Sequence, residues 1–234
     1  MIDWSKYEFR CSSLGDIMTN DRSGKKMGQT CISKLIQIWW KEMYDVEKPL
    51  STKHMEKGII CERDGIDLLS RLVYDGEYLV NNKTRNQNGF ISGECDVYRK
   101  DIGKIHDTKI SWDVETFSKA DMSKTYEWQG IGYMWLWDCD EFELNPCLIS
   151  TPEHLVMDEL RRLAYYMDDA EGTSDKYLEM ELQIQRSMNF ERIPEELRLK
   201  RIPLKRDKSK EDDLIIRITE CRKWLSNFDP KKLI

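Results

Sequence analysis

The sequence lacks any apolar run long enough to cross a bilayer, and its first ten residues lack the apolar core of a secretory signal. It has no C-x-x-C pair, since its seven cysteines are an odd number and are widely spaced. This argues against a zinc ribbon, an iron–sulfur cluster or a disulfide framework. It has only three histidines and no G-x-S-x-G, so a serine or cysteine hydrolase is poorly supported. We expect an intracellular protein with reduced, mostly buried cysteines and no membrane partner.

The sequence also lacks internal repeats, low-complexity tracts and a long linker. Its 234 residues are enough for a substantial core, so we predict one main domain over residues 1–190. A basic segment and a final helix, residues 191–234, are expected to pack on that domain or extend it. The net charge of −6 argues mildly against nucleic-acid binding, but basic residues cluster at 198–210. That cluster is interpreted either as a contact for DNA or a partner, or as a solvated connector.

Apolar residues at helical spacing predict helices over 28–45, 51–74, 123–137, 153–169, 174–187 and 210–226. Ser51 or Thr52 is the expected N-cap of the second helix. Strands are predicted at 89–99, 103–111 and 141–150, with a polar loop at 81–88. This order indicates an α/β (α+β) fold with a small sheet flanked by helices.

The stretch GECDVYRKDIGKIHDTKIS, residues 93–111, places charge on strands that look central to the domain. A turn centred on residues 101 and 102 would set Asp96 opposite Asp107, and a three-residue loop would shift this register by one. In either case the two carboxylates lie close together. Asp107 and Lys109 share one face of their strand, whereas His106 faces the other side and is interpreted as structural.

Two carboxylates at close range repel each other unless a cation lies between them. A hard divalent ion with oxygen ligands, such as Mg²⁺, meets that need. Lys109 would then orient or deprotonate a water beside the metal, or neutralise a phosphate. The alternative is that these residues are ordinary solvated side chains on the open face of a hairpin.

Four motifs in this order resemble the PD-(D/E)XK nuclease superfamily. They are G-x-x-x-E ending at Glu62, SGECD ending at Asp96, the D-x-K triplet of Asp107 and Lys109, and Q-x-x-x-Y with Gln129 and Tyr133. The likeness spans about residues 10 to 151 and is closest to lambda-type and YqaJ-like phage 5′→3′ exonucleases and to RecB-type nuclease domains. It implies a restriction-endonuclease-like core, a central mixed β-sheet flanked by helices.

The resemblance also implies roles for individual residues. Glu62, Asp96, Asp107 and the backbone carbonyl of Thr108 would hold Mg²⁺, with Mn²⁺ as the alternative, and Lys109 would position or activate water. Gln129 and Tyr133 would organise the site or the DNA backbone, although core packing is the default interpretation of their Trp- and Gly-rich helix. Arg10, Ser12 and Ser13 loosely resemble the family's 5′-phosphate pocket, and an ordinary N-cap serine explains them equally well.

The function that this resemblance implies is a Mg²⁺-dependent exonuclease that degrades duplex DNA ends 5′→3′ for phage-type recombination. A single-strand annealing protein and a ring-shaped homo-oligomer are the implied partners, in the cytoplasm of a bacterial host. The alternatives are a structure-specific endonuclease such as a junction resolvase, and a non-catalytic DNA-binding protein with the same fold.

Overall fold

The computed structural model describes residues 2–24, 26–47 and 52–233 of the chain. A mixed four-stranded sheet has the order β4-β5-β6-β7, in which β5 and β6 are parallel and the outer pairs are antiparallel. A second sheet has the order β1-β3-β2. The strands are β1 Phe9–Arg10, β2 Asn86–Gln87, β3 Ile91–Gly93, β4 Val97–Arg99, β5 Lys104–Ile110, β6 Glu141–Cys147 and β7 Ile202–Lys205.

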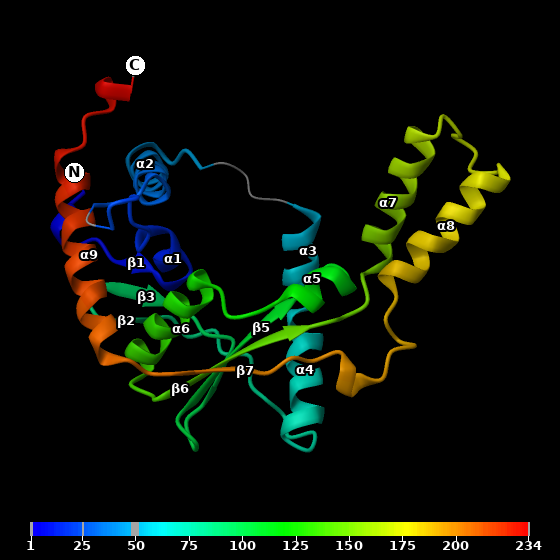
Figure 1. Ribbon diagram of the computed structural model, residues 1–234, viewed down its shortest axis with the longest axis horizontal. Coiled ribbons are helices and arrows are strands. Elements are labelled where there is room, and N and C mark those ends of the chain that lie inside the picture. The colour runs from blue at the N-terminus through cyan, green and yellow to red at the C-terminus, as the bar shows by residue number, and fades with distance from the viewer. Residues whose placement is uncertain (1, 25, 48–51, 234) are drawn as a thin grey trace.

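Helices cover both faces of the four-stranded sheet, which confirms the predicted fold class. The α-helices are α1 Leu14–Ile17, α2 Gln29–Tyr44, α3 Lys53–Ile60, α4 Glu62–Val73, α5 Val114–Lys119, α6 Lys124–Trp137, α7 Glu153–Tyr166, α8 Asp175–Met188 and α9 Lys208–Asn227. The short 3₁₀ helices are η1 Trp4–Lys6, η2 Cys11–Ser13, η3 Glu195–Leu197 and η4 Pro230–Leu233. In Figure 1, α7 and α8 project from the body as a hairpin, and α9 lies at the opposite side of the molecule. No helix in the described residues is both long and apolar enough to span a membrane.

The predicted single helix over 51–74 is wrong, because the chain bends at Cys61 and forms α3 and α4. The backbone of Cys61 has φ −91° and ψ 6°, which ends the regular helix. Thr52 caps α3, its side chain accepting a hydrogen bond from the N–H of Met55, and Ser51 lies outside the described residues. The bend makes Glu62, one of the predicted metal ligands, the first residue of α4.

Helix α6 is the centre of the core, as its apolar sequence predicted. Ile131 and Met134 are fully buried, and the two glycines of the helix allow close packing. A Cβ atom at Gly130 would lie 2.7 Å from the Phe142 ring, and one at Gly132 would lie 2.5 Å from Leu14 Cδ1. Side chains larger than glycine would therefore push α6 away from β6 and α1.

The segment at 198–210 is not a connector, because it contains an edge strand that sequence reasoning missed. Strand β7 pairs antiparallel with β6 and includes Pro203, which an edge strand tolerates because one side of the strand makes no ladder bonds. Helix α9 follows, and its buried Leu214, Ile218 and Leu225 belong to the same hydrophobic core as Leu14. The predicted boundary at residue 190 stays a prediction.

Candidate active site

The hairpin of β4 and β5 sets the spacing of the first two predicted acids. Val97 pairs with His106 and Arg99 with Lys104, which is the register of a turn centred on residues 101 and 102. Asp96 lies just before β4, beside Thr108. One oxygen of Asp96 accepts hydrogen bonds from both the amide N–H and the hydroxyl of Thr108, at 2.7 and 2.9 Å. The side chain of Asp96 is thereby fixed against β5.

Asp107 and Lys109 lie on the face of β5 that α6 covers. Asp107 is 1% exposed, and its Oδ2 lies 2.5 Å from Lys109 Nζ. On the other side, Gln129 Nε2 approaches Asp107 Oδ1 at 3.4 Å and donates to the hydroxyl oxygen of Tyr133 at 3.0 Å. Helix α6 therefore brings Gln129 to the predicted acid, as the order of the motifs indicated.

Tyr133 is only 5% exposed, and its hydroxyl is engaged by Gln129. Burial is the main reason why the pKa of this phenol is raised, and the charge of Asp107 adds to the effect. These contacts are those of a residue that positions Gln129. The predicted contact of Tyr133 with the DNA backbone stays a prediction.

The charges of the hairpin acids act on each other. Burial and the nearby charge of Asp107 raise the pKa of Asp96 to about 6, against the opposing effects of Lys109 and the Thr108 hydrogen bonds. Burial disfavours the charged form of Lys109, but the carboxylates of Asp107 and Asp96 outweigh it, so the pKa of Lys109 is raised. The pair of acids thus attracts positive charge strongly, as expected of a cation-binding group.

His106 faces the opposite side of β5, as its alternation predicted. Its Nε2 lies 2.6 Å from the hydroxyl of Tyr74 on α4, and its Nδ1 lies 2.8 Å from Asn145 Oδ1 on β6. Asn145 in turn donates to Glu143, which is 3% exposed and pairs with Lys104. This buried polar network ties α4 to the sheet and does not reach the Asp107 face.

Glu62 is held by a loop that sequence reasoning treated only as polar. Asn81 Nδ2 donates to Glu62 Oε1 at 2.6 Å, and Lys83 Nζ donates to the same oxygen at 2.8 Å. Burial would raise the pKa of Glu62, but these two hydrogen bonds hold it below its ordinary value. The only signal in the sequence was a cluster of Asn and Lys residues between two elements, which is typical of any surface loop.

The Arg10 to Ser13 segment lies on the same side of the molecule as Tyr133. A Cβ at Gly93 would lie 2.9 Å from both Cys11 Sγ and Tyr133 Cε1, so η2 and α6 meet there. Arg10 and Ser12 are exposed, whereas Ser13 is buried and its hydroxyl donates to the carbonyl of Arg10 at 2.7 Å. Ser13 precedes α1, but its hydroxyl makes no capping hydrogen bond to that helix, so the N-cap interpretation is not borne out for Ser13. Phosphate binding by the segment stays a prediction.

The donors present suit a hard divalent cation in their chemistry. They are carboxylate oxygens together with the predicted Thr108 carbonyl, and the buried Asp107 Oδ2 already attracts one cation, the ammonium group of Lys109 at 2.5 Å. A ready-made cage is absent, since no three His, Cys, Asp or Glu side chains within the described ranges converge closely enough to hold a metal. Each carboxylate is instead held by a local partner, Thr108, Lys109 or Lys83.

Most of the basic side chains at 198–210 are used within the molecule. Arg201 pairs with Glu143, Arg206 with Asp138 and Glu211, and Lys210 with Glu127. Lys200 donates to the carbonyls of Ser118 and Ala120. Lys205 and Lys208 are exposed, and contact of this segment with DNA stays a prediction.

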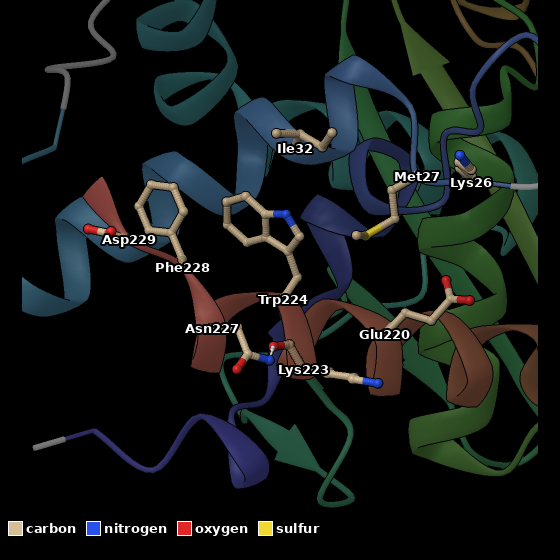
Figure 2. Close-up of a pocket in the computed structure, with 9 residues that line it drawn as sticks. All are labelled: Lys26, Met27, Ile32, Glu220, Lys223, Trp224, Asn227, Phe228 and Asp229. Carbon is tan, nitrogen blue, oxygen red and sulfur yellow. Dashed lines mark hydrogen bonds between the residues drawn. The ribbon is translucent and has the colours of Figure 1, made fainter. Parts of the chain in front are cut away.

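An apolar groove of about 760 Å³ lies elsewhere, between the start of α2 and the end of α9. Figure 2 shows Trp224 and Phe228 from the end of α9 together with Ile32 and Met27, and Lys26 and Lys223 at the rim. None of the predicted site residues lines this groove. It is therefore a separate surface from the carboxylate site.

No family model matches the sequence, and no curated protein matches it. Among solved structures, the chain is similar to a phage-related exonuclease from Haemophilus somnus 129PT. The two are 26% identical with a TM-score of 0.75, and the match covers 94% of this chain and 94% of that one.

An alkaline exonuclease from Laribacter hongkongensis is also similar, at 10% identity and a TM-score of 0.61, over 95% of this chain and 91% of that one. The same enzyme in complex with dAMP matches at 11% identity and a TM-score of 0.59, over 94% and 88% of the two chains. The resemblance to this class of nuclease that the motifs predicted is confirmed by the fold.

Proposed function

We propose that the protein is a metal-dependent DNA exonuclease that hydrolyses phosphodiester bonds from duplex ends in the 5′→3′ direction. The observation that carries this is the placing of Asp107 and Lys109 beneath Gln129, with Asp96 fixed next to them. The near-complete overlap with a phage-related exonuclease supports the exonuclease class.

In this proposal Glu62, Asp96, Asp107 and the Thr108 carbonyl would hold Mg²⁺ or Mn²⁺. When bound there, the ion would supply Lewis-acid stabilisation of the negative charge that develops during phosphodiester hydrolysis. Neighbouring residues hold the proposed ligands in place. Thr108 fixes Asp96, and Gln129 steadies Asp107 while Tyr133 holds Gln129. Lys109, one-third exposed, orients the attacking water and the phosphate at the mouth of the site.

The test uses linear duplex DNA with 5′ phosphates, labelled separately at each end, incubated with the protein and Mg²⁺ or Mn²⁺. Lys109→Ala and EDTA remove the proposed chemistry, and Lys119→Ala is the matched control, because Lys119 is an exposed lysine of α5 paired with Glu115. Nucleotide release from the 5′-ended strand, lost with Lys109→Ala and EDTA but kept in the control, is expected. Cleavage of closed circles or branched DNA would favour an endonuclease, and DNA binding without cleavage would contradict any nuclease.

The wider biological setting is part of the same proposal. Recombination in a bacterial host would require the 3′ single strand that 5′→3′ resection leaves to pass to a single-strand annealing protein. A ring-shaped homo-oligomer would keep the enzyme on its DNA between cuts. Light scattering with and without duplex DNA tests the oligomer, and co-purification with an annealing protein from the same genome tests the partner.

A further inference from the structure

The loop after α4 places two different donors on one carboxylate oxygen. Asn81 and Lys83 are two positions apart in the loop, and the side chains of both reach Glu62 Oε1. Asn82, between them, is turned the other way. Its N–H donates to the carbonyl of Asp96 at 2.7 Å, and its side chain donates to the carbonyl of Cys95 at 3.2 Å. The loop is thus fastened to the strand that carries one acid while it holds another.

The two donors differ in charge and in exposure. Asn81 is neutral, and its carbonyl oxygen is buried without a hydrogen-bond partner. Lys83 is cationic, and its side chain is 68% exposed. Within the described ranges, the Asn81 carbonyl oxygen is one of only four buried side-chain polar atoms without a hydrogen-bond partner. Such unsatisfied atoms are costly in a folded protein, and they are expected where function rather than stability fixes the side chain.

We propose that the Asn81–Lys83 loop sets the metal affinity of the site, with Asn81 as a positioning residue and Lys83 as a competing cation. This rests on the proposed function, in which Glu62 is a metal ligand. Asn81 orients Glu62 without using its charge, in the way that outer hydrogen-bond partners orient metal ligands. Lys83 neutralises the same carboxylate, so a divalent ion must compete with its ammonium group for the charge of Glu62.

The competition has a consequence for the order of events. Lys83 is long, flexible and mostly exposed, so it can leave Glu62 at little cost once a divalent ion supplies the counter-charge. Its released ammonium group would lie beside the site, where the anionic DNA backbone has to approach. Metal binding would therefore create a phosphate contact as well as complete the catalytic site.

The experiment measures Mn²⁺ binding to the full chain without DNA, from the electron paramagnetic resonance signal of free Mn²⁺. The variants are Asn81→Ala, Asn81→Leu, Lys83→Ala and Lys83→Gln, with Lys119→Ala as the control. We expect both Asn81 variants to weaken Mn²⁺ binding by roughly 10- to 100-fold. Both Lys83 variants should tighten Mn²⁺ binding several-fold, and Lys119→Ala should leave it unchanged. Circular dichroism checks that each variant is folded, and Asn81→Leu keeps the volume of the side chain if Asn81→Ala does not fold.

Glu62→Ala and Asp107→Ala separate this inference from the proposed function. If these two variants abolish Mn²⁺ binding while those at Asn81 and Lys83 leave it unchanged, the loop proposal is overturned and the metal site stands. Weaker binding in the Lys83 variants would also overturn the competing role. If the native protein binds no Mn²⁺, or if Glu62→Ala and Asp107→Ala bind it normally, both proposals fail.

Discussion

Thr108 donates both its backbone N–H and its hydroxyl to a single oxygen of Asp96. Thr108 is the middle residue of the D-x-K triplet, a position at which the motif specifies no residue type. Here its two hydrogen bonds hold Asp96 in place beside Asp107. Because Asp96 is partly buried beside Asp107, these donors offset part of the repulsion between the two acids.

Thr108→Val tests this, since valine keeps the branched shape and removes only the hydroxyl. Its unfolding free energy is expected to fall by about 1–2 kcal/mol at pH 8, where Asp96 is ionised, because a hydrogen bond to a charged group is lost. Urea unfolding measures the loss, and Thr108→Ser, which keeps the donor, should lose much less. Equal stability of the valine variant and the native protein would show that the hydroxyl bond contributes nothing.

Gln129 and Tyr133 are predicted to differ in their effect on cleavage. Gln129→Ala removes the side chain next to Asp107, and its cleavage rate should fall on the order of 100-fold through misplacement of the acid. Tyr133→Phe keeps the ring packing and removes only the oxygen that holds Gln129, so its rate should fall less. Single-turnover cleavage of end-labelled duplex at saturating protein separates this effect from DNA binding. A larger loss in Tyr133→Phe would mean that the hydroxyl acts directly on DNA.

Stability is predicted to depend on pH through His106. Burial holds the pKa of this imidazole below its ordinary 6.5, so the unfolded chain takes up a proton first as the pH falls. The folded state therefore loses stability as the pH falls below about 6.5. In His106→Gln the free energy of unfolding should depend less steeply on pH between pH 7 and pH 5.

The native protein has to be compared with His106→Gln because Asp96 acts in the opposite direction. Its pKa is raised to about 6 in the folded state, so its contribution to stability increases as the pH falls. Urea midpoints at several pH values provide the measurement. His154→Gln is the control, since His154 is exposed and pairs only with Glu56 among the described residues. An unchanged slope in His106→Gln would show that His106 titrates normally.

Two neighbouring basic side chains, Arg206 and Lys205, are predicted to contribute differently to stability, because the first is buried in ion pairs and the second is exposed. Arg206 is 9% exposed and pairs with Glu211 and Asp138, so Arg206→Ala should destabilise the fold by about 3 kcal/mol by leaving Glu211 unpaired. Lys205→Ala, one residue away on the exposed side of β7, should leave stability nearly unchanged. Thermal unfolding of both variants tests this. A destabilised Lys205→Ala with a stable Arg206→Ala would reverse the assignment.

The sequence predicted the parts of the site that lie on regular elements. Alternation along β5 put Asp107 and Lys109 on one face and His106 on the other, and helical spacing joined Gln129 to Tyr133. These patterns are local and periodic, and for that reason they are visible in one chain.

What the sequence did not predict depends on tertiary contacts. Asn81 and Lys83 look like any polar loop until the fold brings them to Glu62. Strand β7 has only four residues and is flanked by Arg201 and Arg206. The ion pairs of these arginines, such as Arg201 with Glu143, join positions far apart in the chain. The bend at Cys61 carries no glycine or proline to mark it.

The hairpin of α7 and α8 begins and ends at nearly the same point of the body. The N–H of Thr151 donates to the carbonyl of Met188, and the N–H of Phe190 donates to the hydroxyl oxygen of Ser150. Its tip carries Tyr165 and Tyr166, each close to 90% exposed. Because its two ends are adjacent, a helical hairpin of this kind can be lengthened, shortened or replaced without moving the strands of the sheet. The surface that the hairpin tip presents to other molecules can therefore change in evolution while the residues of the candidate active site stay the same.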